Sequence, residues 1–383
     1  MRFSTFSAAL IASIVGFAGT LPLVLTAAEA VGASPAQTAS WVTAICLAIG
    51  LETLILSVWL RIPSVTAWSV AGLALVGASE GFTINEATGA FIVAGALLIA
   101  TGLFRPLTWL VDRIPTGVSA GMLAGIILPF VMQAAGTVSL DPGFVLPLIV
   151  LFFLLRLWNP ALAIVAVLVA GVAIALTTGR STGSIEPAFS GLVAIAPHFD
   201  PVAIIALALP TYLVTMASQN LPGIAVLKTS GYEPKPGPMI GVTGAFSTIS
   251  ALFGASTTNL SALTAAICTG PDAHPDPQRR WLTGPWYAAF YFLFAAFGAS
   301  LIATVAAMPA TLIHLILGLA LLAPLANAMA IALRDENERL AGVITLAVTA
   351  SGLSIFGVGS AFWGLVAGLV VFFSNFFHWR KLQ

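Results

Sequence analysis

The feature that most constrains the fold of this chain is a succession of apolar stretches whose lengths approach a membrane span. A helix that crosses a bilayer needs about 17–25 mainly apolar residues. Only 7% of the 383 residues are charged and 59% are hydrophobic, whereas a soluble domain carries about 25% charged residues. So few charges could not cover a water-exposed surface. The sequence therefore predicts an all-α polytopic protein of the lipid bilayer.

Glycine, proline and charged residues divide the chain into fourteen apolar segments. The first imitates a signal peptide, but its apolar run exceeds the usual length of about 7–15 residues and predicts a retained helix. Several other segments are too short to cross a bilayer alone. The segments cover residues 6–28, 38–60, 64–78, 87–104, 116–136, 144–155, 159–178, 201–227, 238–252, 255–268, 282–306, 310–333, 340–352 and 355–377.

The positions of lysine and arginine support this division. With a cytoplasmic N-terminus, thirteen of the 14 basic residues fall at cytoplasmic ends of segments, and only Arg180 falls on the other side. The positive-inside rule predicts such an excess. We therefore expect a multi-pass protein of the inner (plasma) membrane with both termini in the cytoplasm.

Composition and motifs also exclude several classes of protein. The formal net charge is zero and no basic stripe is present, so no nucleic-acid partner is expected. The two cysteines lie in apolar segments, which argues against a disulfide framework. We find no nucleophile–base pair and no HExxH motif, so we expect no enzyme activity and no cofactor. His274 lies between Asp272 and Asp276 without a metal-ligand spacing, and we expect no metal.

A longer polar loop over residues 181–200 separates seven segments from seven others. An odd number in each half makes the two halves enter the membrane from opposite sides, which defines an inverted repeat. We predict a first repeat over 1–180, an extracellular or periplasmic linker over 181–200, and a second repeat over 201–383. When the two repeats are aligned at an offset of 192 residues, four positions are identical: Ser64 and Ser256, Thr66 and Thr258, Ser69 and Ser261, and Ala74 and Ala266.

The third and tenth segments, 64–78 and 255–268, are short, and the tenth is unusually polar ("FGASTTNLSALTAAICTG"). Short, interrupted segments at corresponding places in two halves indicate the central site of a transporter. Half-helices that begin at mid-membrane present free N–H groups to an anion, and we expect "STTN", residues 256–259, to cap the second one. The alternative is close helix packing, for which Ser, Thr and Gly are also typical. The candidate substrate-binding residues here are Thr66, Ser69, Thr257, Thr258 and Asn259.

Other polar residues also lie within apolar segments. Ser218, Gln219 and Asn220 follow one another in the eighth segment and are costly in hydrocarbon unless they face protein, water or ligand. Pro222 and Gly223 are expected to break the helix beside them. Glu52 lies in the middle of the second segment, where a carboxyl is either a proton carrier or an interhelix hydrogen-bonding group. Glu29 is either a loop residue or a proton carrier that lines a cavity. We expect His314 to bond between helices.

Several stretches resemble the benzoate–proton symporter family: "AAEAVGASPAQTASW", "RIPSVTAWS", "VTMASQNLPGIAVL", "NLSALTAAICTGPDAHPDP" and "VTASGLSIFGVGSAFWGL". The resemblance runs nearly end to end. It implies a fold with core and gate domains, as in nucleobase transporters and in bicarbonate or sulfate exchangers. The chain departs from the family pattern at Val70 and Ala71, where Thr-Pro is usual, and at Ala255, where Gly is usual.

The resemblance also implies roles for individual residues. Ser218 and Thr258 would occupy places where nucleobase transporters use acidic side chains, and uncharged groups there suit a carboxylate. Trp68 would offer its face to an aromatic ring, or would simply pack in the core.

We therefore expect a secondary active transporter that imports benzoate or a related small aromatic carboxylate with a proton by alternating access. Entry of a monoanion into a negative-inside cell costs about 2.3 kcal/mol per 100 mV, and one proton cancels that charge. The alternatives are a passive small-anion channel or an exchanger on the same fold. The sequence leaves the exact substrate, the stoichiometry and a possible homodimer open.

Overall fold

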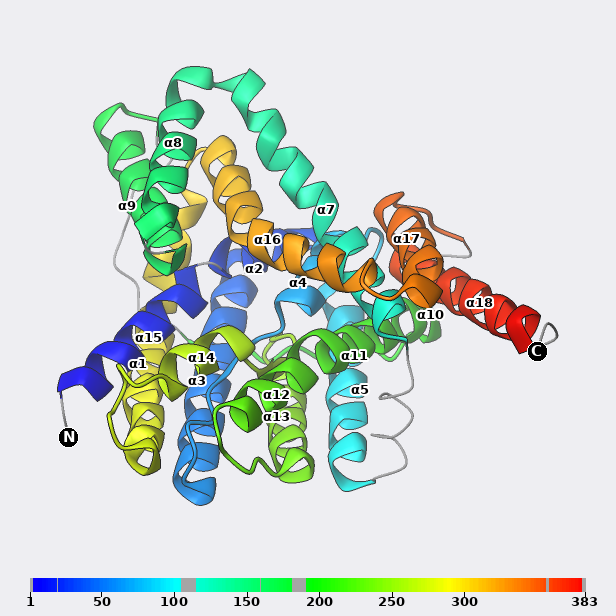
Figure 1. Ribbon diagram of the computed structural model, residues 1–383. Helices are drawn as coiled ribbons and strands as arrows, with labels where there is room; N and C mark the ends of the chain where they lie inside the picture. The colour runs from blue at the N-terminus through cyan, green and yellow to red at the C-terminus, as the bar shows by residue number, and fades with distance from the viewer. Residues whose placement is uncertain are drawn as a thin grey trace.

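The computed structural model describes residues 3–18, 20–104, 115–158, 160–180, 191–355 and 358–380, and it is a mostly helical membrane protein (Figure 1). Within those ranges, seven helices or helix runs are long and apolar enough to cross a bilayer. The two longest are Pro277–Val305 and Pro201–Lys228, and shorter apolar helices lie beside the seven.

The first half of the chain contains one short strand among its helices. Its elements are α1 (Phe3–Ala18), α2 (Leu21–Ala30), α3 (Pro35–Leu60), β1 (Thr66–Trp68), α4 (Val70–Gly77), α5 (Ile84–Leu103), α7 (Thr116–Leu140), α8 (Pro142–Trp158) and α9 (Pro160–Thr177).

The second half repeats the arrangement of a short strand followed by a short helix. Its elements are α10 (Pro201–Ala203), η1 (Ile204–Ala208), α11 (Leu209–Thr215), η2 (Met216–Asn220), α12 (Leu221–Thr229), α13 (Pro236–Ala251), β2 (Thr258–Leu260), α14 (Ala262–Thr269), η3 (Pro277–Leu282), α15 (Thr283–Ala306), α16 (Ala310–Ala332), α17 (Glu336–Ala350) and α18 (Ser360–Arg380).

Local sequence explains where two of the long helices begin. Ser34 accepts a hydrogen bond from the Gln37 backbone N–H, and the Gln37 side chain accepts one from the Ser34 N–H. Thr83 and Glu86 form the same capping box at the start of α5. Such boxes satisfy N–H groups that have no partner inside the helix, which fixes the starts of α3 and α5.

The structure corrects three expectations. The first segment is two helices, because the chain breaks between α1 and α2, where Pro22 follows Thr20. The all-α expectation is wrong at β1 and β2, which pair as strands. The eighth segment does not break beside Pro222, because the helix continues into α12 after two π-helical turns, η1 and η2. A π turn widens a helix locally and is common at functional sites.

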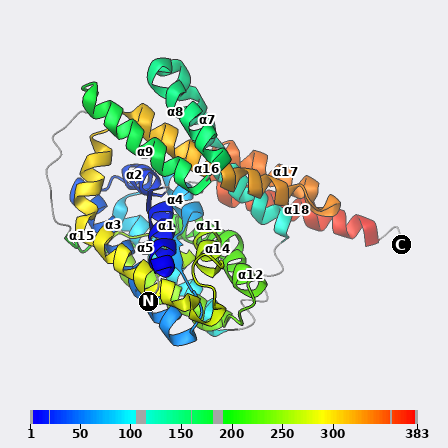
Figure 2. The same ribbon diagram turned by 60° about the vertical axis from the view of Figure 1, so that its left-hand side comes forward.

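The helices form two groups. In the first helix group, α5 packs along α13, α3 along α15, and α2 beside α4. In the second helix group, α7 packs along α16 and α17, α17 along α18, and α8 along α9. In Figure 1 the second group lies along the top and the right of the first, with α8 and α9 at the upper left and α17 and α18 at the right, and Figure 2 shows α17 and α18 again at the right. Glycine allows close contact between helices: a Cβ on Gly102 of α5 would lie 2.6 Å from the backbone of Gly237 and of Gly241.

Residues 191–200 form an extended strap across the first helix group, and the remainder of the expected linker, 181–190, lies outside the described residues. Ser40 of α3 accepts a hydrogen bond from Val193 N–H, and Ile195 N–H donates to the carbonyl of Leu252. On α5, the Asn85 side chain donates to the carbonyl of Ala196. The strap therefore ties the ends of α3, α5 and α13 together.

Candidate functional site

Two short strands meet at the centre of the first helix group. Strand β1 pairs with β2 in antiparallel register, with Thr66 opposite Leu260, Ala67 opposite Asn259 and Trp68 opposite Thr258. All six residues are buried. Backbone that is not helical is tolerated at membrane depth only inside protein or beside a cavity. Here the strands pair with each other, and the side chains of Thr53, Ser247 and Asn220 accept from the remaining N–H groups of Thr66, Thr258 and Leu260. The name strand pair is used below for Thr66–Trp68 with Thr258–Leu260.

Each strand leads into a short helix that is capped by a serine. The Ser69 hydroxyl accepts from Gly72 N–H at the start of α4, and the Ser261 hydroxyl accepts from Thr264 N–H at the start of α14. The segment "STTN" was expected to cap the second half-helix, which is incorrect, because Ser256–Asn259 precede or form β2 and the cap is Ser261. The caps leave other N–H groups of each first turn without helical partners.

Hydroxyl groups from three elements meet beside the start of α4. The Ser69 hydroxyl lies 2.6 Å from that of Thr215 on α11, and Thr215 lies 3.3 Å from the Thr257 hydroxyl. Gly72 makes this approach possible, since a Cβ there would lie 3.0 Å from both the Ser69 hydroxyl and a methyl group of Thr211. Thr215 was not among the predicted site residues, and only its position one turn before Ser218 and Gln219 could have indicated it.

A carboxyl group lies on the other side of the strand pair. The Thr258 hydroxyl donates to Oε1 of Glu52 at 2.6 Å, and both residues are fully buried. The Thr66 hydroxyl is also close to this carboxyl. Ser247 of α13 accepts from the Thr258 N–H and lies 3.1 Å from its hydroxyl. The structure thus brings together Glu52, Thr66 and Thr258, which the sequence singled out separately.

Amide side chains line the edge of β2. Asn220 accepts from Leu260 N–H at 2.9 Å, and the Asn259 amide donates to Gln219 at 3.3 Å. Among the described residues, Oδ1 of Asn259 and the hydroxyls of Thr211 and Ser256 are buried without a hydrogen-bond partner. Leaving such groups unpaired is costly, so these atoms are available to a polar ligand.

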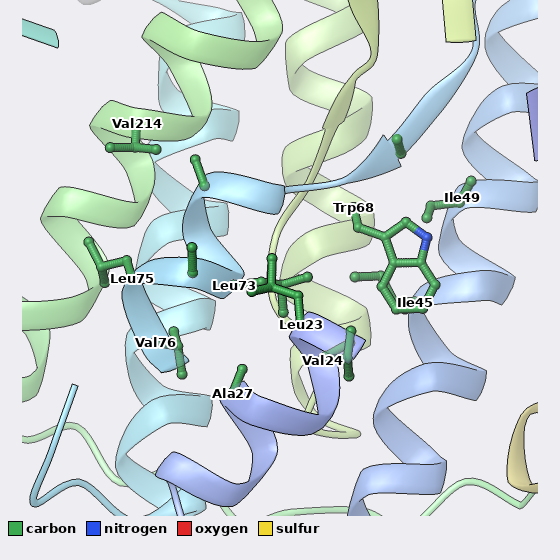
Figure 3. Close-up of a cluster of buried hydrophobic side chains, with 14 of the residues drawn as sticks. Leu23, Val24, Ala27, Ile45, Ile49, Trp68, Leu73, Leu75, Val76 and Val214 are labelled. Carbon is green, nitrogen blue, oxygen red and sulfur yellow. The ribbon is translucent and has the colours of Figure 1, made fainter. Parts of the chain in front are cut away.

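Trp68 packs as a core residue at the end of β1. Its indole N–H donates to the Tyr291 hydroxyl at 3.3 Å, and its ring meets Phe17 edge-on. Figure 3 shows the indole beside Ile45 and Ile49 of α3. The ring of Tyr287 stacks on that of Tyr291, and the Tyr287 hydroxyl donates to the carbonyl of Thr66. The sequence did not indicate either tyrosine, because both lie in an aromatic-rich apolar helix that resembles ordinary lipid-facing sequence.

Three other expected residues lie apart from this centre or play a local role. The Ser218 hydroxyl donates to the carbonyl of Val214 within its own helix. Glu29 is exposed at the last turn of α2. His314 lies 3.4 Å from Gln133 of α7, between two helices as expected.

A cavity of about 390 Å³ lies between the two helix groups. It reaches the last residues of α4, parts of α7 and η1, and the facing ends of α17 and α18. None of the predicted substrate-binding residues lines it. This α4-end cavity and the strand pair lie at opposite ends of α4, whose eight residues span about 12 Å.

Two helix groups, a buried non-helical centre and a cavity between the groups define a multi-pass membrane transport protein. Comparison with known sequences identifies its family: the description "Benzoate membrane transport protein" matches residues 1–373. The chain belongs to this family.

Two relatives show the extent of the similarity. The chain is 39% identical over 373 residues to "Inner membrane protein YdcO" of Escherichia coli, covering 96% of this chain and 95% of the relative. It is 31% identical over 368 residues to the "Benzoate membrane transport protein" of Acinetobacter baylyi, covering 96% and 93%.

Solved structures share the fold at low sequence identity. The transmembrane domain of a cyanobacterial bicarbonate transporter, BicA, gives a TM-score of 0.60 at 15% identity, with 96% of this chain and 98% of that chain covered. SLC26A9 gives 0.66 at 11% identity, with 95% and 64% covered. This likeness concerns the fold alone.

Proposed function

We propose that this protein is a secondary active transporter that imports benzoate or a related small aromatic carboxylate together with a proton. The observation that carries the proposal is the buried hydrogen-bonding centre that forms where β1 and β2 pair, with the carboxyl of Glu52 beside it and no cationic side chain in the surrounding helices. The helices around it, α3, α4, α11, α13, α14 and α15, contain no lysine, arginine or histidine. Family membership and the relative named as a benzoate transport protein support the substrate class.

The substrate carboxylate binds at the strand pair. Free N–H groups at the starts of α4 and α14 carry partial positive charge. The Thr257 hydroxyl and the Gln219 amide add donors. The Thr258 hydroxyl is bonded to Glu52, and the Asn259 amide donates to Gln219 and to the carbonyl of Leu260. These two residues therefore fix the surrounding frame, together with Ser69, Thr66 and Asn220. Trp68 forms part of the apolar wall, and Ser218 lies in the same π-turned segment as Gln219.

The proposed inverted repeat, 1–180 and 201–383 around the linker 181–200, is supported by the register of the strands. The pairs Thr66–Leu260, Ala67–Asn259 and Trp68–Thr258 map onto one another when the 192-residue offset is applied. Backbone bonds follow the same rule: Ser69 N–H donates to Thr257, and Ser261 N–H donates to Val65. Two equivalent half-helices thus start from one pseudo-twofold axis near Ala67 and Asn259.

Glu52 is the proposed proton carrier. Because the Ser247 hydroxyl donates to the carbonyl of Thr243 at 2.7 Å, it can only accept from Thr258. The single Thr258 hydroxyl proton can therefore point to an ionised Glu52, or turn to Ser247 when Glu52 is protonated and donates to Thr258. The Thr258 hydroxyl therefore has a partner in either protonation state of Glu52 without a change in heavy-atom positions, whereas Oε2 of Glu52 is buried without a hydrogen-bond partner among the described residues.

This arrangement gives a physical reason for coupling. A substrate carboxylate about 6 Å from an ionised Glu52 would be repelled by about 3 kcal/mol at an effective dielectric constant of 20. A proton on Glu52 removes that repulsion, so anion and proton bind together. Glu29 is the second candidate, but its exposed position places it away from this centre.

Alternating access would move the first helix group, as the core domain, against the second, as the gate domain. The excess of basic residues on one side of the predicted topology supports cytoplasmic termini. The α4-end cavity then opens toward the outside, and the strand pair lies at mid-membrane.

Uptake into proteoliposomes tests the proposal. An inward proton gradient should drive labelled benzoate above its equilibrium concentration, and aliphatic acids of similar size should compete poorly. A passive channel would only equilibrate the label, and an exchanger would need internal anion. Either result would overturn proton symport.

A further inference from the structure

The α4-end cavity has the size and lining of a ligand site rather than of a packing defect. Its volume of about 390 Å³ falls in the range of about 300–1,000 Å³ that is typical of small-molecule pockets. Such pockets combine an apolar surface with a few polar groups. A gap that only separated two moving helix groups would need neither this volume nor this combination of apolar and polar lining groups.

One side of the cavity is apolar. Leu75 of α4 and Ile126, Pro129 and Phe130 of α7 form it. A single aromatic ring on the cavity wall favours an edge-to-face or offset contact with another ring. This side therefore suits the ring of a small aromatic molecule.

The other side carries hydrogen-bonding groups and no charge. Gln133, whose side chain is exposed, and the hydroxyl residues Ser79, Ser351 and Ser360 line it, and no charged residue is among the lining residues described. The 21-residue helix α18 begins at Ser360, so its first N–H groups lie at the cavity. The three serine hydroxyls already donate to backbone carbonyls, and the Gln133 amide lies 3.4 Å from His314. The first N–H groups of α18 are therefore the donors for a carboxylate.

Two other helix ends weaken the site for an anion. Helices α4 and α17 both end at the cavity, at Gly77–Ser79 and Thr349–Gly352, and helix C-termini carry partial negative charge. Pro129 also lacks the N–H that the carbonyl of Gly125, another lining residue, would otherwise accept from. One helix N-terminus and two helix C-termini at the cavity predict weak binding of an anion. Weak binding suits a position that the substrate occupies only transiently during transport.

We propose that the α4-end cavity is a second, weaker binding position for the same small aromatic carboxylate, separate from the strand pair; the identity of the ligand rests on the proposed function. The ring lies against Phe130 and Pro129, and the carboxylate faces the start of α18 at Ser360, with Gln133 at the wall of the cavity. Helix α4 joins the two positions, since it begins at Ser69 beside the strand pair and ends in the cavity.

Protection of a cysteine placed at Gln133 tests this proposal in purified protein in lipid nanodiscs. Both native cysteines, Cys46 and Cys268, are buried, so Gln133→Cys supplies the reactive thiol. Benzoate at about ten times its half-protecting concentration should slow reaction with a small methanethiosulfonate reagent about tenfold. Thr178→Cys, exposed at the end of α9, is the control and should show no protection.

A second background separates the two binding positions. In Gln133→Cys/Asn259→Ala, binding at the strand pair is impaired, and protection at residue 133 should persist at similar benzoate concentrations. Loss of protection there would show that residue 133 is shielded only when the strand pair binds ligand, which overturns a separate position. Absence of protection in both proteins also overturns it.

The ring contact has its own test. Phe130→Ala should raise the half-protecting benzoate concentration several-fold at Gln133→Cys, while Phe130→Tyr should preserve it. An unchanged value in Phe130→Ala would contradict the proposed ring position. Because protection measures binding alone, these results stand even if uptake proves to be passive or exchange-driven.

Discussion

The hydroxyl of Thr258 lies 2.6 Å from Oε1 of Glu52, in a part of the protein where both side chains are fully buried. One residue belongs to a helix and the other to a strand that are 206 positions apart in the chain. The contact therefore links a group that can carry a proton to the strand that presents Thr257 and Asn259. The first two predictions follow from it.

Replacing Thr258 with valine should change how uptake depends on pH. The variant keeps the shape of the side chain but removes the donor to an ionised Glu52, so the half-maximal pH for uptake should move upward. Thr258→Ser should restore the wild-type profile because it keeps the hydroxyl. Proton-driven uptake measured across pH is the test, and an unshifted profile in Thr258→Val would exclude the proposed link.

Glu52→Gln should abolish accumulation driven by a proton gradient while leaving counterflow exchange measurable. The amide resembles the protonated acid, so the substrate still binds but no proton is released. Glu29→Gln is the matched comparison, and it should accumulate benzoate normally. The reverse pattern would assign the proton to Glu29.

Asn259→Ala should weaken benzoate binding about 10- to 150-fold. Asn259 holds the Gln219 amide, so the change should lose the hydrogen bond from Gln219 to the carboxylate, and such a bond to a charged group contributes about 1.5–3 kcal/mol. Ser261→Ala should affect binding less, since Ser261 caps α14, although loss of a cap costs about 1 kcal/mol of stability. Binding to purified protein by calorimetry measures both. An Asn259→Ala affinity within twofold of wild type would mean that the segment serves packing only.

Gly102→Ala and Gly241→Ala should have opposite effects on stability, although both glycines lie at the same helix contact. A Cβ at Gly102 would come within 2.6 Å of backbone atoms of α13, whereas a Cβ at Gly241 would meet no atom within 4 Å. Gly102→Ala should therefore lower the melting temperature in detergent. Gly241→Ala should leave it unchanged or raise it, because alanine favours a helix by about 0.5–1 kcal/mol over glycine. Equal melting temperatures would contradict the close α5–α13 packing.

Cysteine labelling tests the predicted orientation. Residue 274 is not a suitable position for a labelling cysteine, because His274 is buried and its ring accepts a hydrogen bond from the Asp276 backbone N–H. Asp272→Cys, at an exposed neighbouring position, should resist an impermeant reagent in sealed cells, and Thr178→Cys should react. Labelling of residue 272 from outside would reverse the topology.

The sequence predicted what depends on local composition. The lengths of the apolar runs and the positions of the charged residues predicted the segments. Segments 64–78 and 255–268 stood out because they are short and, in the second case, polar. The depth of Glu52 followed from its place in an uninterrupted apolar run. These properties are local, so they can be read without knowing which segments touch.

The sequence could not predict what depends on contacts between distant segments. Residues "TAW" and "TNL" become strands only because each provides the other's backbone partners, and neither is long enough to indicate a strand alone. The sequence also carried no signal for the π turn at Met216–Asn220. The α4-end cavity depends on the ends of α4, α17 and α18 and on the middle of α7, none of which is distinctive by itself.

The joint between β1 and β2 is made by main-chain atoms, and main-chain hydrogen bonds do not depend on which side chains the residues carry. Exchange of Thr66, Thr257 or Asn259 would therefore alter the chemistry presented at the joint without dismantling it. A scaffold of this kind is evolvable: new selectivity can arise by single substitutions at the centre of the protein, where changes in most membrane proteins would prevent folding. Directed evolution toward other aromatic acids would best begin at these positions.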